Sequence, residues 1–283
     1  MGNGRVNGVA ILDAIPEGEL NTARRLRENL RDISSNTADG LHVRYVRVST
    51  LADLETGISS LVDEAQNSAL KPWLHLEGHG SADESGFQFA SGTHCSWNQL
   101  KELITPLNVA TGLNLLLILA TCFGGSFARA IRTTDRAPVL GLLGPTREVK
   151  SGQIESGFIA FYRSFIETSS LKKAIEVLNA TAPDNPYYRT TARQFFYEVW
   201  VSYKKNQCTP QEIENRARRM YREAKAQILP KTPSIGQLKR LIRSREKELF
   251  EKYRDIYFMY DLDETNRTRF PVTYKEAETY VSR

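Results

Sequence analysis

The sequence predicts an α/β fold with a mostly parallel central sheet, followed by a helical C-terminal extension. Through the first two thirds, short apolar or alternating runs typical of strands alternate with longer segments of helical period. One run, Leu113–Ala120, is almost continuously apolar, as expected for a strand covered on both faces. After Pro183 the strand pattern gives way to helical segments. Hydrophobic residues make up 41% of the 283 residues and charged residues 25%, a globular composition.

The first two thirds supply the predicted sheet and its covering helices. Strands are expected at Val6–Leu12, Val43–Val48, Trp73–Glu77, Leu113–Thr121 and Val139–Leu143, with a small hairpin at Phe87–Ala90 and Gly92–Cys95. Helices are expected at Leu20–Leu30, Leu51–Ala65, Trp97–Leu107, Ser126–Thr133, Ile154–Thr168 and Leu171–Ala182. In Leu51–Ala65 the apolar residues share one face, and Thr50 precedes them as an N-cap.

The last third is predicted to be helical, with one final strand. Helices are expected at Ala192–Lys205, Pro210–Leu229 and Ile235–Asp255, and Thr209-Pro210 is typical of a helix start. The run Ile256–Leu262, "IYFMYDL", indicates a last strand. We therefore expect a core over residues 1–185 and a helical, basic region over 186–283, either as a second domain or as decoration of the first.

Charge is distributed unevenly along the chain. Between Lys204 and Arg254 there are 15 Lys and Arg against 6 Asp and Glu, a surplus of +9, whereas the remainder carries −4. Alternating signs, as in "RSREKELFEKYRD", favour a solvated helical face with i, i+4 pairing. These helices could also dock a partner, and nucleic acid is the less favoured partner.

Cysteine content and hydropathy bear on the compartment. Three cysteines do not make a disulfide framework, so a reduced, cytoplasmic setting is expected. The longest apolar run is too short to cross a bilayer, so no membrane association is expected.

Chemistry is predicted at the ends of two strands, where reactive groups of a parallel sheet gather. His79 lies between two glycines at the end of the first strand, in "LHLEGHGS". Cys122 ends the second strand, in "LLLILATCFGGSFARAI", and is followed by Phe123, two glycines and an expected helix. A thiolate is a strong nucleophile that a neighbouring imidazole, and a helix N-terminus, would favour. The backbone N–H groups of Gly80 and Cys122 could then hold an oxyanion.

These residues resemble the caspase-like (clan CD) cysteine peptidases, which include caspases, metacaspases, separase, gingipains and the bacterial CHAT peptidases. The family has an apolar strand ending in His-Gly and, about 40–50 residues later, a second ending in Cys-x-Gly. Here these are His79-Gly80 and Cys122-Phe123-Gly124, 43 residues apart. The segment from Ala137 to Ala180, with "FYRSF" and "SLKKAI", also resembles the region after the cysteine in CHAT domains. The resemblance covers Val6–Ala182.

The resemblance implies a three-layer caspase-like sandwich and a cysteine endopeptidase acting on a protein substrate through a Cys-His dyad, with no cofactor. It further suggests a bacterial regulatory or defence protease. Only "TTDRAP" stands where caspases carry a long, cleavable linker. We therefore expect control by a protein partner, a ligand or an upstream protease rather than by cutting that linker.

Three charged residues are candidates for the substrate pocket: Asp13, Arg147 and Glu148. Asp13 or Glu148 would select a basic P1 side chain, which family breadth favours, and Arg147 an acidic one.

Two alternatives remain. One is an inactive caspase-like interaction module or a basic-tail nucleic-acid binder. The other is a zinc site built on His75 and His79, which the strand setting disfavours because it sends the two side chains away from a shared helical face. We expect His75 to be a packing histidine, and no metal site.

Overall fold

The computed structural model describes residues 6–35, 41–184, 187–226 and 232–280, and the chain divides into two compact units. Unit 1 comprises Met1–Arg132 and Ala137–Thr191, and unit 2 comprises Thr133–Arg136 and Ala192–Arg283. The boundary expected at residues 185 and 186 falls outside the described residues. No helix in the described part of the chain is long and apolar enough to span a bilayer.

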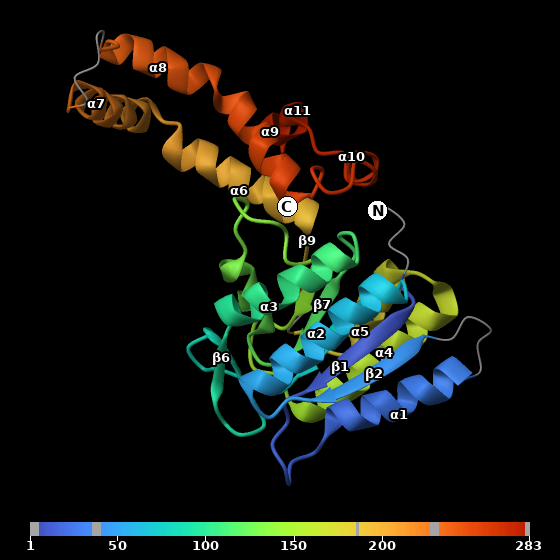
Figure 1. Ribbon diagram of the computed structural model, residues 1–283. Helices are drawn as coiled ribbons and strands as arrows, with labels where there is room; N and C mark the ends of the chain where they lie inside the picture. Colours follow the sequence, from blue (N-terminus) through green and yellow to red (C-terminus); the bar gives the residue numbers. More distant parts are fainter. Residues whose placement is uncertain (1–5, 36–40, 185–186, 227–231, 281–283) are drawn as a thin grey trace. The chain divides into compact units, whose positions relative to one another are not determined.

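A six-stranded sheet forms the centre of unit 1, in the order β2-β1-β3-β7-β8-β9 (Figure 1). The strands are β1 (Gly8–Asp13), β2 (His42–Arg47), β3 (Pro72–Glu77), β7 (Leu116–Ala120), β8 (Gly141–Gly144) and β9 (Tyr188–Thr191). All neighbours pair in parallel except β8 and β9. In this register Asp13 lies beside Glu77, and Glu77 beside Ala120, so β1, β3 and β7 end at one edge.

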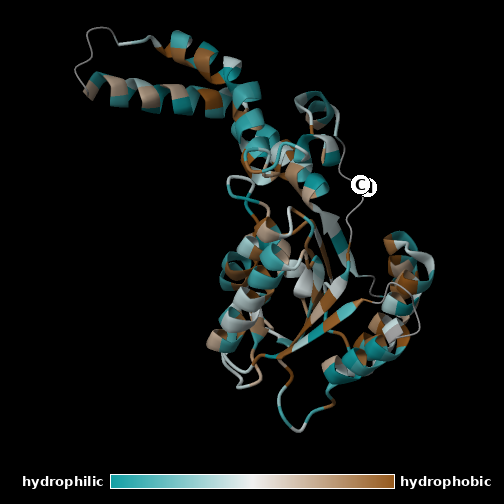
Figure 2. Cartoon of the chain, turned by 45° about the vertical axis from the view of Figure 1, so that its right-hand side comes forward, coloured by the Kyte–Doolittle hydropathy of each residue, from teal (hydrophilic) through white to brown (hydrophobic). Residues whose placement is uncertain are grey.

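Helices cover both faces of this sheet. The helices of unit 1 are α1 (Thr22–Ser35), α2 (Leu51–Asn67), α3 (Trp97–Ala110), α4 (Ser151–Thr168) and α5 (Leu171–Ala180). One core joins Val9, Trp73 and Ile118 of the sheet to buried residues of α1, α4 and α5. On the other face, α2 packs against Val46 of β2 at Gly57, and α3 packs against α2. The central strands β1, β3 and β7 are buried along their whole length, whereas the edge strands β2 and β9 carry polar residues, and the strands in Figure 2 accordingly range from hydrophobic to hydrophilic.

A small antiparallel sheet follows β3 and carries the first candidate residue. It consists of β4 (His79–Gly80), β5 (Gly86–Gln88) and β6 (His94–Ser96). The aromatic rings of Phe87 and Trp97 stack beneath it, with centroids 6.1 Å apart. The hairpin expected from the sequence is therefore present, and it gains a third strand from the His-Gly segment.

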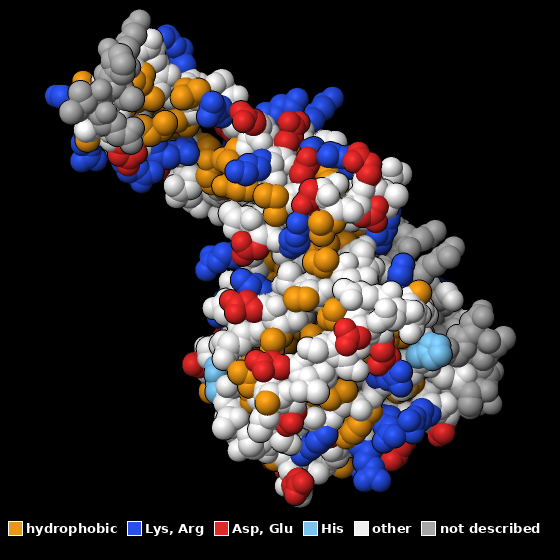
Figure 3. Space-filling view, in the orientation of Figure 1, with side chains coloured by type: hydrophobic (Ala, Val, Ile, Leu, Met, Phe, Trp, Pro, Cys, Tyr) orange, Lys and Arg blue, Asp and Glu red, His pale blue; other side chains and the backbone are white. Residues whose placement is uncertain are grey.

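Unit 2 is helical. Its elements are α6 (Ala192–Gln207), α7 (Pro210–Ala226), α8 (Ile235–Ser244), α9 (Glu246–Tyr257), α10 (Asn266–Arg269) and α11 (Tyr274–Thr279). Phe196 lies at its centre among the rings of Phe250, Tyr257 and Phe258. Side chains of α6, α7, α8 and α9 line a cavity of about 370 Å³, with apolar groups beside Lys and Arg on this part of the surface (Figure 3).

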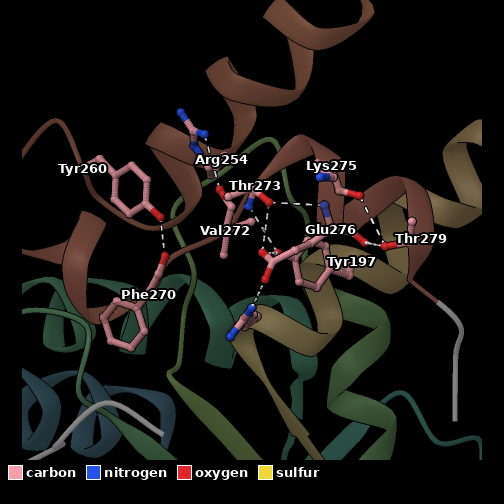
Figure 4. A network of polar contacts seen from close by, with 10 residues as sticks. Tyr197, Arg254, Tyr260, Phe270, Val272, Thr273, Lys275, Glu276 and Thr279 are labelled. Carbon is pink, nitrogen blue, oxygen red and sulfur yellow. Dashed lines mark hydrogen bonds and ion pairs between the residues drawn. The ribbon is translucent and has the colours of Figure 1, made fainter.

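Polar contacts hold the last described residues against α6 (Figure 4). The Tyr197 hydroxyl donates to the Glu276 carboxylate at 2.7 Å, and Arg193 pairs with the same group at 3.0 Å. Thr273 caps α11 by accepting the Glu276 N–H. Burial, and next the hydrogen bond to Glu276, raise the pKa of Tyr197 to about 12.

The α/β class and the mostly parallel sheet predicted from the sequence are confirmed. Several details differ. The expected strand Ile256–Leu262 is wrong, because α9 continues to Tyr257 and turns follow, with Met259 at a φ of 56°. Its aromatic side chains fill the core of unit 2, and a short apolar run suits a helix end as well as a strand.

The expected helix Ile235–Asp255 is two helices that meet at Arg245. The expected helix at Ser126–Thr133 is instead a 3₁₀ segment, η1 (Gly124–Ala130). The edge strand β9 was missed because it is short and polar. Of the expected helix Pro210–Leu229, residues 227–229 lie outside the described part of the chain.

Candidate active site

His79 follows a buried strand and stands between two closely packed glycines. β3 is buried along its whole length, and the chain then turns through Gly78 into β4. A Cβ on Gly78 would lie 3.0 Å from that of Ala14. A Cβ on Gly80 would lie 1.8 Å from the carbonyl oxygen of Cys122, far inside contact distance. Glycine at position 80 therefore lets the His-Gly segment lie directly against the Cys122 backbone.

Cys122 stands on a tight turn at the end of β7. Thr121 before it is fully buried, and Phe123 after it adopts a left-handed conformation with φ 58°. Gly124 then closes the turn by donating its N–H to the Thr121 carbonyl at 3.1 Å. A Cβ on Gly124 would lie 2.7 Å from that of Leu119, so this glycine too is required by space. The thiol is half-buried at this turn.

The environment of the thiol differs from the expectation. The early N–H groups of η1 are already used, since Gly124 donates to Thr121 and Gly125 donates to Pro145 at 2.9 Å. They therefore do not present a free helix N-terminus to Cys122. Instead the Val149 N–H, just before α4, donates to the Cys122 sulfur at 3.4 Å.

The two candidate catalytic side chains lie on adjoining segments but engage other groups. The His79 Nε2 is 2.8 Å from the Glu19 carboxylate. The Cys122 thiol donates to the Val149 carbonyl, with 3.8 Å between sulfur and oxygen. Among the described residues, His79 and Cys122 are not hydrogen-bonded to each other. The Nδ1 of His79 has no hydrogen-bond partner among the described residues.

The two backbone amides proposed for an oxyanion hole, those of Gly80 and Cys122, lie on adjoining segments. The Ser81 N–H donates to Gly86, and Gly80 faces Phe87 in the next pair. Hydrogen-bonded and non-hydrogen-bonded pairs alternate in an antiparallel ladder, so the Gly80 N–H points away from β5. The Cys122 N–H has no acceptor in the described part of the chain. Two amides on adjoining segments are the arrangement that stabilises an oxyanion.

The loop between β8 and α4 surrounds the Cys122 turn and carries two of the candidate pocket residues. Its backbone accepts from Phe123 at Arg147 and from Gly125 at Pro145, at 3.3 and 2.9 Å. Arg147 and Glu148 are both exposed. Both therefore stand within two residues of Val149, which contacts the thiol, and a bound substrate could reach them.

Asp13, the third pocket candidate, is fully buried and its oxygens are occupied. Oδ1 accepts from the Ile15 N–H at 2.9 Å, and Oδ2 accepts from Asn21 at 2.8 Å and pairs with Arg47 at 2.8 Å. The Tyr45 hydroxyl also donates to Oδ2; burial, and next this bond, raise the Tyr45 pKa to about 12. Asp13 could receive a substrate cation only by giving up Arg47.

The remaining histidines and cysteines have other surroundings. His75 is a packing histidine, as predicted: it is fully buried against Phe158, with Nε2 2.9 Å from Glu77 and the Tyr162 hydroxyl at Nδ1. Burial raises the pKa of the Cys95 thiol to about 12, so it is a poor nucleophile. The described residues contain no group of three His, Cys, Asp or Glu that could hold a metal ion.

Sequence reasoning missed Glu19. Its signal was its place in the loop after the first strand, since loops at the carboxyl ends of parallel strands share an edge with His79. Comparison with known proteins adds no identity: no family model matches the chain, and no curated protein is significantly similar to it.

Proposed function

We propose that this chain is a cysteine endopeptidase in which Cys122 is the nucleophile and His79 the general base and acid. The observation that carries the proposal is the close approach of Gly80 to the Cys122 backbone. The segment that carries His79 therefore lies beside the Cys122 turn, at the edge where reactive groups of a parallel sheet gather. The caspase-like resemblance of the same residues supports the reaction class.

The reaction would proceed through a thioester. The Cys122 thiol gives its proton to the His79 imidazole, and the sulfur attacks the substrate's peptide carbonyl carbon. The N–H groups of Gly80 and Cys122 hold the oxyanion that forms. The carbon–nitrogen bond then breaks, and the imidazolium protonates the leaving amine. Water, activated by His79, attacks the thioester, releasing the carboxylic acid product and the free thiol.

We further propose that a protein partner or an upstream protease controls this activity, as in a bacterial regulatory or defence protease. The support is that His79 and Cys122 each engage another group, so that the hydrogen bond between them has still to form. Purified full-length chain that cleaves protein substrates at full rate without partner or processing would contradict this part.

Covalent trapping tests the proposal. A peptidyl electrophile should add once to the wild type, at Cys122, as measured by intact-protein mass spectrometry and peptide mapping. Cys122→Ala and His79→Ala should lose the adduct. Cys208→Ala is the matched control: its thiol is also half-buried but belongs to unit 2, so labelling should persist.

Labelling and cleavage that neither Cys122→Ala nor His79→Ala alters would remove the peptidase proposal. An interaction module or a nucleic-acid binder would then be the better description. Binding of random oligonucleotides that weakens steeply with salt would distinguish the binder.

A further inference from the structure

We propose that Glu19 is a positioning residue for His79, holding the imidazole through Nε2 so that Nδ1 serves the Cys122 thiol. This inference rests on the proposed function, because it assigns a part to a third side chain in the same site. The observation behind it is the contact of 2.8 Å between Glu19 Oε2 and His79 Nε2, between residues 60 positions apart.

The loop that carries Glu19 is anchored at both ends. At its start the Ala14 N–H donates to the Glu77 carbonyl at 2.8 Å, and the Ile15 N–H to the Asp13 carboxylate. At its end the Asn21 amide donates to the same carboxylate. Buried Asp13 thus closes the loop, and the side-by-side register of β1 and β3 puts that loop next to the strand leading to His79.

The chemistry needs a fixed ring and a fixed tautomer. A neutral imidazole that donates from Nε2 carries its lone pair on Nδ1, where a thiol proton can be received. A carboxylate accepting from Nε2 selects this tautomer and holds the ring in place. When His79 becomes an imidazolium in the reaction, the same carboxylate faces its positive charge.

The contact between His79 and Glu19 is expected to contribute little to the stability of the fold. The His79 and Glu19 side chains are 50% and 47% exposed, and an exposed ion pair adds little to folding. Removing Glu19 should therefore leave the melting temperature nearly unchanged while altering the behaviour of His79. Those two readouts separate a positioning role from a structural one.

Imidazole ¹⁵N NMR reads the tautomer directly, without any turnover. The chain contains four histidines, and His79→Ala assigns the signal of interest. Wild-type His79 should be predominantly Nε2-protonated at a pH where it is neutral. Glu19→Ala should mix the tautomers, whereas Glu17→Ala, in the same loop and also exposed, should not. An unchanged tautomer ratio in Glu19→Ala would overturn the inference.

Reaction rates at Cys122 supply the second readout. Glu19→Ala should slow labelling by both a peptidyl electrophile and iodoacetamide by about 10- to 100-fold. Glu19→Gln, whose amide oxygen can still accept from Nε2, should fall between Glu19→Ala and wild type, and Glu17→Ala should match wild type. Slowing with the peptidyl reagent alone would overturn the inference, because it would assign Glu19 to substrate binding.

The two proposals fail differently. Wild-type reactivity in Glu19→Ala, with Cys122→Ala unreactive, removes only the role of Glu19. Wild type that reacts no faster than His79→Ala removes the dyad itself, and the role of Glu19 with it.

Discussion

At position 80 a single hydrogen stands where any other residue would carry a Cβ, and that Cβ would lie 1.8 Å from the Cys122 carbonyl oxygen. The atom in the way belongs to the backbone, which cannot move aside by changing a side-chain rotamer. The whole His-Gly segment or the whole cysteine turn would have to move. Gly80 thus sets the spacing between the segments that carry His79 and Cys122.

Gly80→Ala should therefore destabilise the protein by about 1–3 kcal/mol, as overpacking does, and abolish electrophile labelling at Cys122. Urea unfolding and intact-protein mass spectrometry measure the two effects. Gly152→Ala is the control, because a Cβ on that residue of α4 meets nothing within 4 Å. A Gly80→Ala protein that labels at the wild-type rate would refute the role assigned to this contact.

Asp13 shows that a residue's place in the sequence can suggest one role and its contacts another. Its position at a strand end suggested a substrate pocket. In the structure it is buried, accepts hydrogen bonds from Ile15 and Asn21 at the two ends of the loop, and forms an ion pair with Arg47. Through these contacts Asp13 holds together the two ends of the loop that carries Glu19. Its role in selecting a basic P1 residue stays a prediction.

At the scale of elements, α11 depends on the carboxylate of Glu276. That group accepts from Tyr197 and Thr273 and pairs with Arg193 (Figure 4). The Tyr197 hydrogen bond is the largest cause that lowers the pKa of Glu276 from its ordinary value of 4.5. Because the folded pKa lies below the unfolded one, this stabilisation is present above about pH 4.5 and fades as the pH falls through the folded pKa.

Glu276→Gln should consequently lower stability at pH 7 by less than about 1 kcal/mol, since the pair is half-exposed. Near pH 3 the difference from wild type should shrink. Thermal unfolding of the two proteins at both pH values measures this. A difference that grows in acid would contradict the assigned direction of the pKa shift.

In the turn after β7 the sequence predicted the position of a helical segment correctly but its kind of helix wrongly. The sequence pattern predicted a helix at Ser126–Thr133, and a helical segment is present at Gly124–Ala130. It is a 3₁₀ segment because the left-handed Phe123 tightens the turn and Pro145 takes the N–H of Gly125. The donor to the thiol consequently comes from Val149, on a loop 27 residues farther along.

At the scale of the whole molecule, each compact unit has its own core. The core of unit 1 joins the sheet to α1, α4 and α5. The core of unit 2 is built from aromatic rings around Phe196. The cationic surplus between Lys204 and Arg254 belongs to unit 2, whereas His79 and Cys122 belong to unit 1.

A substitution in one core should therefore destabilise one unit and leave the unfolding of the other unchanged. Phe196→Ala should destabilise unit 2 by about 3–5 kcal/mol, and Phe161→Ala should do the same to unit 1. Calorimetry should show that each variant shifts a different transition, and Cys122 labelling should survive only in Phe196→Ala. A single transition, shifted equally by both, would show that the units unfold together.

The sequence by itself determined the alternation of strands and helices, the parallel sheet, and the two glycine-flanked strand ends. These follow from local periodicity and from the space that glycine leaves, which short segments express on their own. Only the tertiary structure decided three contacts: Gly80 lies against Cys122, Glu19 contacts His79, and Arg47 forms an ion pair with Asp13. It also decided that Ile256–Leu262 does not form a strand. Each of the three contacts joins segments that are distant in sequence, so it depends on strand order and loop closure, which no short stretch of sequence encodes. The structure of Ile256–Leu262 could not be decided from its own sequence, because a short apolar run can fill a core either as a helix end or as a strand.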